Sequence, residues 1–516
     1  MTLAETVTDF ALAKAYGRLR RRDVALTSVK GTVFHMYDPT SALWLERGDH
    51  DVKRDFAEVM GAAASSKIAQ ADAQAKAATC TDAAKKALQN EAEAWEAVHA
   101  KVESARQRCN CLSDIKSLLA NTDLVLKLDA NPDLLPLPNA KVVDLRTGAL
   151  HDRQRDHFFT FELEATYLGI GAPTPLIDAF MNDLMVGDAA MVAYLQRLLG
   201  YAMTGHVTQQ LLSIWSGSGG NGKGVLCRAL ERLLRRLFVT MDSDVLIKRP
   251  SASAGAHSAH LYKLKGACLA VLQETQEDDV INDKAVKDLS GGDSIACRPL
   301  YRDPVDVVPQ FLPVLVTNSV PKLHVDGGIR RRIVIIPFRA EFKVESEFDA
   351  HNTLHRLADP DVDARMASDD AQSQLLTWLV QGAVQWYADP DLKSRKPAVV
   401  ASFTQEYLAE NDDIQTFLDG CVTLEPTDPS RRASTDALYE AYCALTEVSP
   451  LSHKAFVAGM RRKGHERQQV TIRTDDAAST ALTPNEREQL FGGRKSLRLR
   501  VYPRLQLQSA TVETLT

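Results

Sequence analysis

The sequence predicts an α/β protein built around a parallel sheet. Residues 209–216 form an apolar run, residues 217–224 a glycine-rich loop, and residues 225–237 an amphipathic helical pattern. Further apolar runs at residues 267–274, 310–318 and 332–338 have the length of buried strands. Helical patterns separate these runs, and this alternation is typical of strands that lie parallel.

The glycine-rich loop carries the clearest chemical signal. It runs Gly217-Ser-Gly-Gly-Asn-Gly-Lys223-Gly between a strand and a helix. Glycines let successive backbone N–H groups turn inward around a phosphate, and the lysine adds positive charge at the β- and γ-oxygens. We predict ATP binding, rather than an ordinary glycine-rich turn, with contacts from Gly217, Gly219, Gly220, Asn221, Gly222, Lys223, Gly224 and Val225.

Two positions weaken the expected Mg²⁺ site. Gly224 stands where a Ser or Thr normally offers its hydroxyl to the metal, and Gln273 stands where an aspartate is usual. Glu274 is the natural carboxylate beside the loop, as catalytic base or metal ligand. Asn318, at the end of another strand, is a candidate contact of the γ-phosphate or the attacking water; a turn residue before Pro321 is the alternative.

The composition is that of a globular protein, with 45% hydrophobic and 25% charged residues among 516. A net charge of −6 argues against wholesale coating of nucleic acid, although local basic patches remain compatible with it. No apolar run approaches the length of a membrane span. No membrane partner is therefore expected. Eight scattered cysteines suggest neither a zinc site nor a disulfide framework, which favours a reduced cytoplasmic setting.

The flanking regions are mostly helical in pattern. We expect a helix at residues 7–22, strand-like segments at 32–39 and 43–45, a charged helical hairpin or bundle at 51–119, and short strands and turns at 128–148. Residues 175–204 and 346–405 read as helical, the latter as amphipathic. The predicted domains are residues 1–170, 171–345, 346–411 as a helical lid, and 412–516.

The C-terminal domain has the element order of a winged helix. Helices are expected at residues 414–421, 434–445 and 452–464, followed by two strands. Ser434 and Ser452 can cap their helices, and Gly464 can end the third. The domain concentrates positive charge at Arg461, Arg462, Lys463, Arg467, Arg494, Lys495, Arg498 and Arg500. This favours DNA binding, with a protein-contact module as the alternative.

Three consecutive arginines, Arg330 to Arg332, precede the last apolar strand. A nucleotide held by one subunit is commonly completed by an arginine from its neighbour, because guanidinium charge stabilises the transferring phosphoryl group. We therefore predict catalytic roles for Arg331 and Arg332. A surface charge cluster is the alternative interpretation.

Taken together, these segments resemble the ordered motifs of superfamily 3 helicases. The resemblance rests on the glycine-rich loop, Glu274, Lys287-Asp-Leu-Ser-Gly-Gly-Asp293-Ser-Ile-Ala-Cys-Arg298-Pro-Leu-Tyr301, Thr317-Asn-Ser-Val-Pro321 and Gly328-Ile-Arg-Arg-Arg332. It is closest to the helicase half of phage and plasmid primase-helicases, which are related to the poxvirus primase-helicase. Residues 128–148 and 199–205 resemble the helicase-preceding domain of that group, and the likeness runs from about residue 30 to 505.

The resemblance implies an AAA+-type ATPase with a mostly helical N-terminal domain. It also implies a ring, usually a hexamer, that uses ATP and Mg²⁺ to move 3′-to-5′ along single-stranded or forked DNA. In the pore motif, Lys287, Arg298 and Arg302 would grip phosphates, and Tyr301 would stack on a base. Residues 1–120 lack the paired aspartates of a primase, so a separate primase or polymerase is the expected partner.

The predicted function is that of an ATP-driven DNA helicase or translocase, which acts in the replication of a phage, satellite or plasmid in a bacterial host. Gly224 and Gln273 motivate an alternative: a replication-initiation or loading ring that binds ATP and DNA but scarcely hydrolyses or unwinds. A nucleotide-switched regulatory ATPase that does not act on DNA is a third possibility, and the segment from Lys287 to Tyr301 argues against it.

Overall fold

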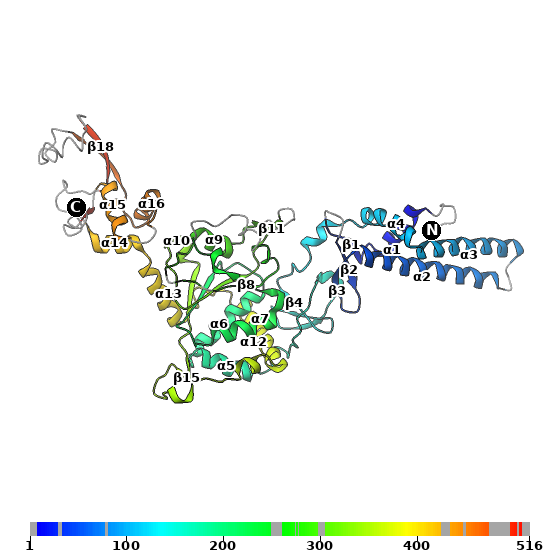
Figure 1. Cartoon of the computed structure of the whole chain (residues 1–516), viewed down its shortest axis with the longest axis horizontal. Helices are drawn as coiled ribbons and strands as arrows, with labels where there is room; N and C mark the ends of the chain where they lie inside the picture. Colours follow the sequence, from blue (N-terminus) through cyan, green and yellow to red (C-terminus); the bar gives the residue numbers. More distant parts are fainter. Residues whose placement is uncertain are drawn as a thin grey trace.

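The computed structural model of the chain combines an N-terminal helical arm, a central parallel sheet and a small C-terminal module (Figure 1). It describes residues 8–28, 33–77, 81–248, 261–273, 275–276, 278–297, 305–424, 434–446, 450–473, 496–502 and 505–507. The mixed α/β class predicted from the sequence is confirmed. None of the described helices is both long and apolar enough to cross a membrane.

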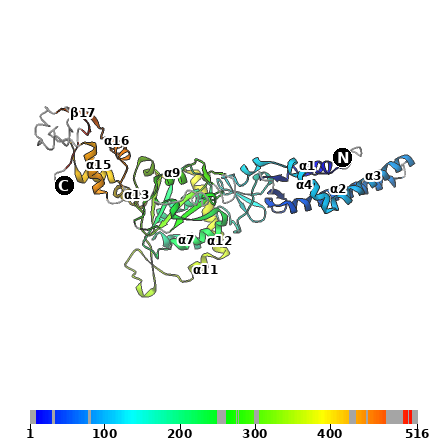
Figure 2. The same ribbon diagram turned by 45° about the horizontal axis from the view of Figure 1, so that its top comes forward.

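The N-terminal arm is mainly helical, as predicted. Helix α1 (Asp9–Arg20) begins where the Thr8 side chain accepts the Ala11 N–H at 3.1 Å. Strands β1 (Val24–Leu26), β2 (Phe34–Asp38) and β3 (Leu43–Arg47) then form an antiparallel sheet. Helices α2 (Asp49–Ala75) and α3 (Asp82–Glu103) form a long hairpin that projects from the molecule, and α4 (Ala105–Leu118) packs on α1 (Figures 1 and 2).

The arm is joined to the central sheet by short strands and two helices. After η1 (Thr122–Leu126), strands β4 (Leu134–Leu137), β5 (Lys141–Asp144) and β6 (Leu150–Asp152) form a second antiparallel sheet, followed by η2 (Arg155–His157). The helical segment expected at residues 175–204 is two helices, α5 (Pro175–Leu184) and α6 (Ala189–Met203). The break falls at Val186 and Gly187, which both have positive φ, and Asp188 caps α6.

The central sheet contains five parallel strands in the order β13-β7-β12-β9-β8. They are β7 (Leu212–Ser216), β8 (Phe238–Asp242), β9 (Leu269–Gln273), β12 (Leu312–Thr317) and β13 (Ile333–Pro337). The apolar runs predicted as strands at residues 209–216, 267–274, 310–318 and 332–338 are therefore confirmed over most of their length.

Each face of this sheet carries its own core, because successive side chains of a strand point to opposite faces. On one face Trp215, Val314 and Ile336 pack with α5, α6, α7 (Lys223–Leu234) and α12 (Asp369–Ala388). On the other face Ile214, Leu315 and Ile335 pack with α9 (Asp283–Ser290), α10 (Gly327–Arg330) and α13 (Ala398–Glu410). Helices cover both faces, as expected for a parallel sheet.

The prediction that residues 346–405 are mostly helical is confirmed, because helices cover more than half of them, but the predicted amphipathic character is wrong for α12 and the segment also contains a short strand. Strand β15 (His355–Leu357) pairs in parallel with β14 (Glu341–Lys343), and η5 (Glu345–Glu347) and α11 (Val362–Met366) are short. Helix α12 is buried on nearly all sides over residues 371–380 rather than amphipathic. It crosses α6 so closely that a Cβ on Gly200 would lie 2.2 Å from the backbone of Gly382.

The C-terminal module begins with α14 (Asp413–Cys421), α15 (Thr435–Leu445) and α16 (His453–Arg462). The predicted caps are confirmed, since Ser434 and Ser452 accept backbone N–H groups, and Gly464 follows α16 with φ of 86°. Strand β17 (Gln468–Arg473) pairs with β18 (Ser496–Val501), and β16 (Val422–Leu424) pairs with β19 (Leu505–Leu507). Tyr442, Phe456 and Phe417 lie in its separate core.

Candidate nucleotide site and nucleic-acid surfaces

The glycine-rich loop leaves the carboxyl edge of the sheet between two neighbouring strands. Ser216, the last residue of β7, pairs with Thr317 of β12 on one side and with Pro337 of β13 on the other. On β9, Gln273 pairs with Val316 of β12. Because the ends of these parallel strands are aligned, the loop and the residues that follow β9 and β12 meet at one edge, which is where ligands bind in open α/β sheets.

The loop holds Lys223 inside its curve. Lys223 is only 4% exposed, and its Nζ donates to the carbonyl of Gly217 at 2.7 Å. Asn221 is also buried, and its side-chain amide donates a hydrogen bond, 3.4 Å long, to the carbonyl oxygen of Phe338. Phe338 directly follows β13. The first contact closes the loop on the start of α7, and the second ties the loop to the residue that follows β13.

Two of the glycines are required by their surroundings. A Cβ on Gly217 would lie 2.2 Å from the Asn221 amide, and one on Gly222 would lie 2.5 Å from Leu184. Gly222 also has φ of 79°, in the left-handed region that side chains disfavour. The sequence pattern therefore corresponds to a tightly built cradle rather than to a surface turn.

The electrostatics of the loop favour an anionic ligand. Desolvation by burial lowers the pKa of Lys223 to about 8. No carboxylate pairs with this ammonium among the described residues. A polyphosphate that entered the loop would supply the missing negative charge, next to the helix N-terminus that also attracts anions.

Asn318, one of the residues expected to assist hydrolysis, lies at the same edge of the sheet. Asn318 follows β12 directly and is exposed. The hydroxyls of Thr317 and Thr275 are 2.6 Å apart and link β12 to the segment after β9. Glu274 lies between Gln273 and Thr275 in the chain but outside the described residues, so its predicted role is untested.

The part of the chain that the structure describes offers few ligands for a metal ion. The described residues contain no cluster of three or more His, Cys, Asp or Glu side chains suited to an ion. Gly224, at the start of α7, has no hydroxyl to contribute. Mg²⁺ often binds through one carboxylate, water and the substrate's phosphates, so the nucleotide itself would have to supply part of any such site.

An apolar cavity of about 490 Å³ opens beside the loop and was not foreseen from the sequence. Gly220, Gly222 and Val225 form its loop side, and it is otherwise lined by Leu176, Ala179, Phe180, Asp183, Phe342, Leu357, Ala358, Asp359, Val362, Arg365 and Met366. Its size and apolar walls suit a nucleoside. Phe342 is held next to the loop, because its backbone N–H donates to the Gly220 carbonyl at 3.2 Å. No local motif marks these residues, since they come from α5, β14 and α11.

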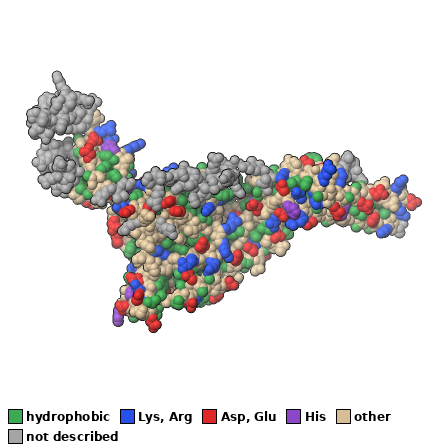
Figure 3. All heavy atoms as spheres, viewed as in Figure 1, with side chains coloured by type: hydrophobic (Ala, Val, Ile, Leu, Met, Phe, Trp, Pro, Cys, Tyr) green, Lys and Arg blue, Asp and Glu red, His purple; other side chains and the backbone are tan. Residues whose placement is uncertain are grey.

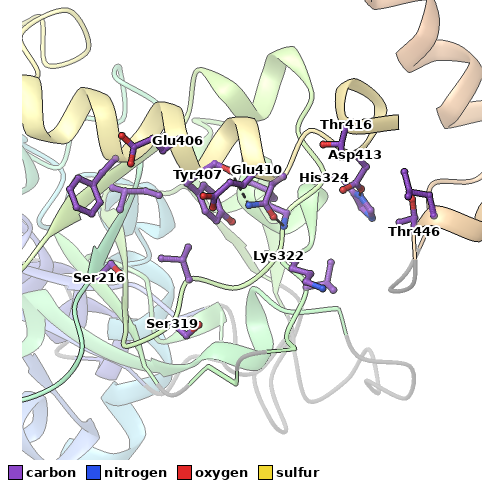
Figure 4. Close-up of a pocket in the computed structure, with 17 residues that line it drawn as sticks. Ser216, Ser319, Lys322, His324, Glu406, Tyr407, Glu410, Asp413, Thr416 and Thr446 are labelled. Carbon is purple, nitrogen blue, oxygen red and sulfur yellow. Dashed lines mark hydrogen bonds and ion pairs between the residues drawn. The ribbon is translucent and has the colours of Figure 1, made fainter. Parts of the chain in front are cut away.

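A second cavity, of about 710 Å³, lies by the opposite face of the sheet (Figure 4). It extends from Ser216 and Ser319 to α13 and α14, and Figure 4 shows Glu406 and Glu410 along α13. Asp413 also lines it and lies 3.1 Å from His324. These carboxylates disfavour an anionic ligand in this cavity.

The two predicted catalytic arginines lie at the wrong edge of the sheet to act on their own subunit's loop. They directly precede Ile333, which pairs with Leu212, the first residue of β7. The loop follows the last residue of β7, about 16 Å away along the strand. Arg331 is exposed, whereas Arg332 is buried and donates to the Ser290 hydroxyl at 3.0 Å. Burial, and then the nearby Arg331, lower the pKa of Arg332.

The expected pore motif is described only in part. Lys287 lies near the end of α9, and its Nζ is 2.8 Å from a carboxylate oxygen of Asp326. Strands β10 (Ile295–Cys297) and β11 (Val305–Val307), one within the motif and one after it, pair antiparallel. Arg298, Tyr301 and Arg302 lie outside the described residues.

The basic residues of the C-terminal module fall into different environments. Arg461 and Arg462 are exposed, with no ion pair among the described residues, whereas Lys463 pairs with Asp412 at 2.6 Å. Asp412 is 7% exposed and also lies 3.2 Å from Arg330 of α10. Asp412 therefore links Lys463 of the C-terminal module to Arg330 of the core. A cavity of about 330 Å³ is lined by Lys454, Val457, Ala458, Arg461, His465, Glu466, Arg467 and Tyr502. Arg500 is exposed, Arg498 lies on β18 without a described side chain, and Arg494 and Lys495 are outside the described residues.

The fold and this geometry define the central part of the chain as an α/β protein with a glycine-rich loop at the carboxyl edge of a parallel sheet. Residues 12–186 match the family model described as D5 N terminal like. A protein of Acanthamoeba polyphaga mimivirus, named provisionally as a helicase, is 28% identical over 316 residues, which cover 60% of this chain and 32% of that protein. A provisionally named helicase of Frog virus 3 (isolate Goorha) is 24% identical over 283 residues, which cover 54% of this chain and 28% of that protein.

A provisionally named primase of African swine fever virus (isolate Pig/Kenya/KEN-50/1950) is 20% identical over 347 residues, 66% of this chain and 33% of the relative. The chain thus spans about a third of the length of the curated relatives it matches. Among solved structures, the apo C-terminal region of NrS-1 matches with a TM-score of 0.37 and 12% identity, over 72% of this chain and 84% of the other. The resemblance drawn from the ordered motifs is confirmed as far as the D5-type family model and the viral relatives named provisionally as helicases and primases.

Proposed function

We propose that the chain is an ATP-dependent DNA helicase or translocase of AAA+ type. The observation that carries this proposal is the buried Lys223, which has no carboxylate partner among the described residues and lies in a glycine cradle at the start of α7. Such a site is built for a polyphosphate. The names of the viral relatives, which give them provisionally as helicases and primases, support action on DNA during replication.

The nucleotide in this proposal is ATP, with its adenosine in the apolar cavity and its phosphates in the loop. Asn318 contacts the γ-phosphate or the attacking water, and Glu274 holds Mg²⁺ or activates the water. The cavity beside Gly220 and Gly222 supports this orientation, because it begins where the phosphate loop ends.

The active form in this proposal is a ring, most simply a hexamer. The position of Arg331 supports it, because this exposed arginine lies at the far edge of the sheet from its own loop. In a ring it would face the loop of the neighbouring subunit and stabilise the charge on the transferring phosphoryl group. Arg332 is better suited to hold this segment in place, since its guanidinium is already bonded to Ser290.

Single-stranded or forked DNA is the proposed substrate, with movement in the 3′-to-5′ direction. The segment from Lys287 to Arg302 would contact the strand in the pore. The C-terminal module would act as a winged helix, with Arg461 and Arg462 on phosphates. We propose the domains as residues 1–170, 171–345, 346–411 and 412–516, and a separate primase or polymerase as partner in replicating a phage, satellite or plasmid.

Two observations favour a second function. Gly224 at the start of α7 offers no metal-binding hydroxyl, and Gln273 ends β9 where a carboxylate would be expected. Slow hydrolysis would suit an initiation or loading ring that binds ATP and DNA but does not unwind.

A strand-displacement assay separates the two functions. Purified protein is mixed with a forked duplex, ATP and Mg²⁺, with the Lys223→Ala variant as the control. The helicase proposal expects displacement by the wild type alone. Nucleotide-dependent DNA binding with negligible turnover and no displacement would establish the loading ring instead.

A further inference from the structure

The N-terminal arm contains a small basic cavity at the junction of four segments distant in the sequence. Its volume is about 220 Å³, and it is lined by Arg21, Arg22, Ala25, Trp44, Asn121, Leu124, Lys127, Arg155, Asp156 and Phe158. Arg21 and Arg22 follow α1, Trp44 belongs to β3, Lys127 follows η1, and Phe158 follows η2. It lies on the arm, away from α7 and the phosphate loop (Figure 1).

The charge around this cavity is largely uncompensated. Arg21, Arg22 and Lys127 are exposed and have no ion pair with any described residue. Arg155 is the exception, since it pairs with Asp23 at 3.1 Å and with Asp156 at 3.4 Å. Blue lysine and arginine side chains also gather on the arm in the space-filling view (Figure 3). Three free cations around one hollow create a local field that attracts phosphates despite the net charge of −6.

Aromatic rings form part of the wall. The rings of Trp44 and Phe158 stack with centroids 6.0 Å apart, and the Lys127 ammonium lies 5.8 Å from the centroid of Phe158. The Trp44 indole N–H donates to the Arg155 carbonyl at 3.0 Å, and this hydrogen bond fixes the orientation of the Trp44 ring. Phe158 is half-buried, so part of its ring remains accessible from the cavity.

The backbone conformation of Phe158 is an independent sign that this ring position matters. Its φ is 57° and its ψ is 33°, the left-handed conformation that a bulky residue rarely adopts. Its N–H donates to the Arg155 carbonyl, and its own carbonyl accepts the Asp129 N–H, both at 3.1 Å. Glycine would satisfy this turn without strain, so a large aromatic residue here is better explained by its ring than by the turn.

We propose that this cavity binds one nucleotide of a single-stranded nucleic acid, with phosphates on Arg21, Arg22 and Lys127 and a base on Phe158. Phosphate-gripping cations beside an aromatic platform are the means by which proteins hold single strands. The volume of about 220 Å³ is below the range for a complete small-molecule ligand, which favours part of a longer strand over a free nucleotide. The site extends the proposed function, because it would hold the strand on the arm independently of ATP.

The test measures binding of a fluorescent 20-nucleotide deoxythymidine strand to the full chain without ATP, across a salt series. Arg21→Gln, Arg22→Gln and Lys127→Gln are combined in one variant. Single strands lose a slope of about 0.7 per phosphate contact, so the log–log salt slope should shrink by about 2. The matched control combines Lys67→Gln, Lys76→Gln and Lys86→Gln on the α2–α3 hairpin, where the same charge is removed from exposed positions. The control should keep the wild-type slope.

Phe158→Gly tests the ring separately. Because glycine accepts the left-handed turn, the variant should keep the backbone of the turn, although loss of the ring's packing against Ala25, Trp44 and Leu124 should lower the melting temperature. It should bind the strand on the order of tenfold more weakly under conditions where it remains folded. An unchanged affinity in both the Phe158→Gly and the triple variant would overturn the proposal. A second outcome would also overturn the proposal: the triple variant loses the wild type's binding of deoxythymidine monophosphate but still binds the strand as well as the wild type. The site would then bind a free nucleotide and not a strand.

The result is separable from the proposed function. Lys223→Ala should abolish ATP turnover while leaving this ATP-independent strand binding intact. If the wild type fails to displace strands but the triple variant still loses salt slope, the helicase proposal fails and the N-terminal site stands. If displacement works and the slope does not change, the N-terminal site fails and the helicase proposal stands.

Discussion

Lys287 and Asp326 form an ion pair, with 2.8 Å between Nζ and a carboxylate oxygen, that joins α9 to α10. Asp326 also caps α10 by accepting the Ile329 N–H at 2.7 Å, and Arg332 is bonded to Ser290 at the other end of this contact. The helix that carries the expected DNA-contacting lysine is therefore attached to the turn that carries the expected trans-acting arginine. Contacts of this kind can transmit movement between a DNA site and a neighbouring ATP site.

We predict that releasing this pair strengthens, rather than weakens, single-strand binding. Asp326→Asn keeps the cap, because asparagine is an equally good N-cap, but frees the Lys287 charge. Lys287→Met should instead lower affinity and reduce the salt slope by about 0.7. Titration of labelled single strands in a salt series distinguishes the two variants. Equal losses in both would mean that Lys287 acts only on the fold and does not contact DNA.

The same carboxyl makes the α9–α10 contact sensitive to acid. Burial opposes its ionisation, but the Lys287 hydrogen bond and the α10 amides outweigh this and hold the pKa of Asp326 below its usual range. A carboxyl whose pKa is lower in the folded chain than in the unfolded chain stabilises the fold at any pH above its unfolded-state pKa. This stabilisation is lost as the pH falls through the folded-state pKa. The melting temperature measured at decreasing pH should therefore fall less steeply in Asp326→Asn than in the wild type.

ATP affinity should fall as the pH rises above about 8. Burial lowers the pKa of Lys223 to about 8, whereas a bound triphosphate favours the charged form. Below this pH the lysine is already protonated and affinity is flat; above it, binding requires proton uptake and weakens by up to about tenfold per pH unit. Fluorescent-nucleotide titrations from roughly pH 7 to roughly pH 9, about one unit on each side of the midpoint, would show the change of slope.

Lys223→Arg is the control, because arginine stays charged throughout this range and should give a flat profile. Without nucleotide the sign reverses. The unfolded chain binds the Lys223 proton up to a pH of about 10.4, so between about 8 and that value this residue's contribution to the free energy of unfolding rises with pH. A wild-type affinity profile as flat as that of the arginine variant would show that Lys223 is not desolvated.

Arg331 and Arg332 should have different phenotypes. Arg331→Ala should abolish ATP hydrolysis with ATP binding intact, and mixing it with Lys223→Ala subunits should restore some turnover, since each subunit supplies what the other lacks. Arg332→Ala should mainly destabilise the fold, by about 1–3 kcal/mol, because it removes a buried hydrogen bond to Ser290. Turnover and chemical denaturation of each variant give the comparison. Absence of recovery in every mixture, together with a monomer at working concentration, would contradict the ring.

The local elements of this fold could be predicted from the sequence because their signals are local. The strand–loop–helix unit around Lys223 and the caps at Ser434 and Ser452 follow from short-range patterns of apolar, glycine and hydroxyl residues. Helix α12 could not be read correctly, because its burial on nearly all sides depends on α6 crossing at Gly200 and Gly382, which are far apart in the sequence.

The same distinction applies to the candidate sites. The phosphate loop was visible as a motif, whereas the cavity beside it combines α5, β14 and α11. Lys463 and Arg461 are close in the sequence and chemically alike, yet only Lys463 meets the buried Asp412. Which of several basic residues is free to bind DNA is thus decided by tertiary partners that no local pattern reveals.

The apolar cavity should contribute affinity for the nucleoside and not for the phosphates. Phe342→Ala removes a ring that lines it, so ATP binding should weaken by on the order of tenfold while binding of inorganic tripolyphosphate stays unchanged. Phe403→Ala is the matched control, since that ring lines the acidic cavity on the other face. Competition titrations against a fluorescent nucleotide measure both ligands. A reversed pattern, with Phe403→Ala the weaker binder of ATP, would place the nucleoside in the other cavity.

The C-terminal basic residues should separate into DNA contacts and a structural contact. Arg461→Gln combined with Arg462→Gln removes two exposed charges, so the salt slope for a single strand should shrink by about 1.4 with little change in stability. Lys463→Met leaves the buried Asp412 with Arg330 and the Gln415 N–H but without its nearest cation, so it should lower the free energy of unfolding by about 1–3 kcal/mol and leave the slope nearly unchanged. Denaturation curves and salt-dependent strand binding of both variants provide the measurements. A loss of salt slope in Lys463→Met alone would contradict this assignment. Arg461 and Arg462 would then not contact DNA, and the support for a DNA-binding C-terminal module would be removed.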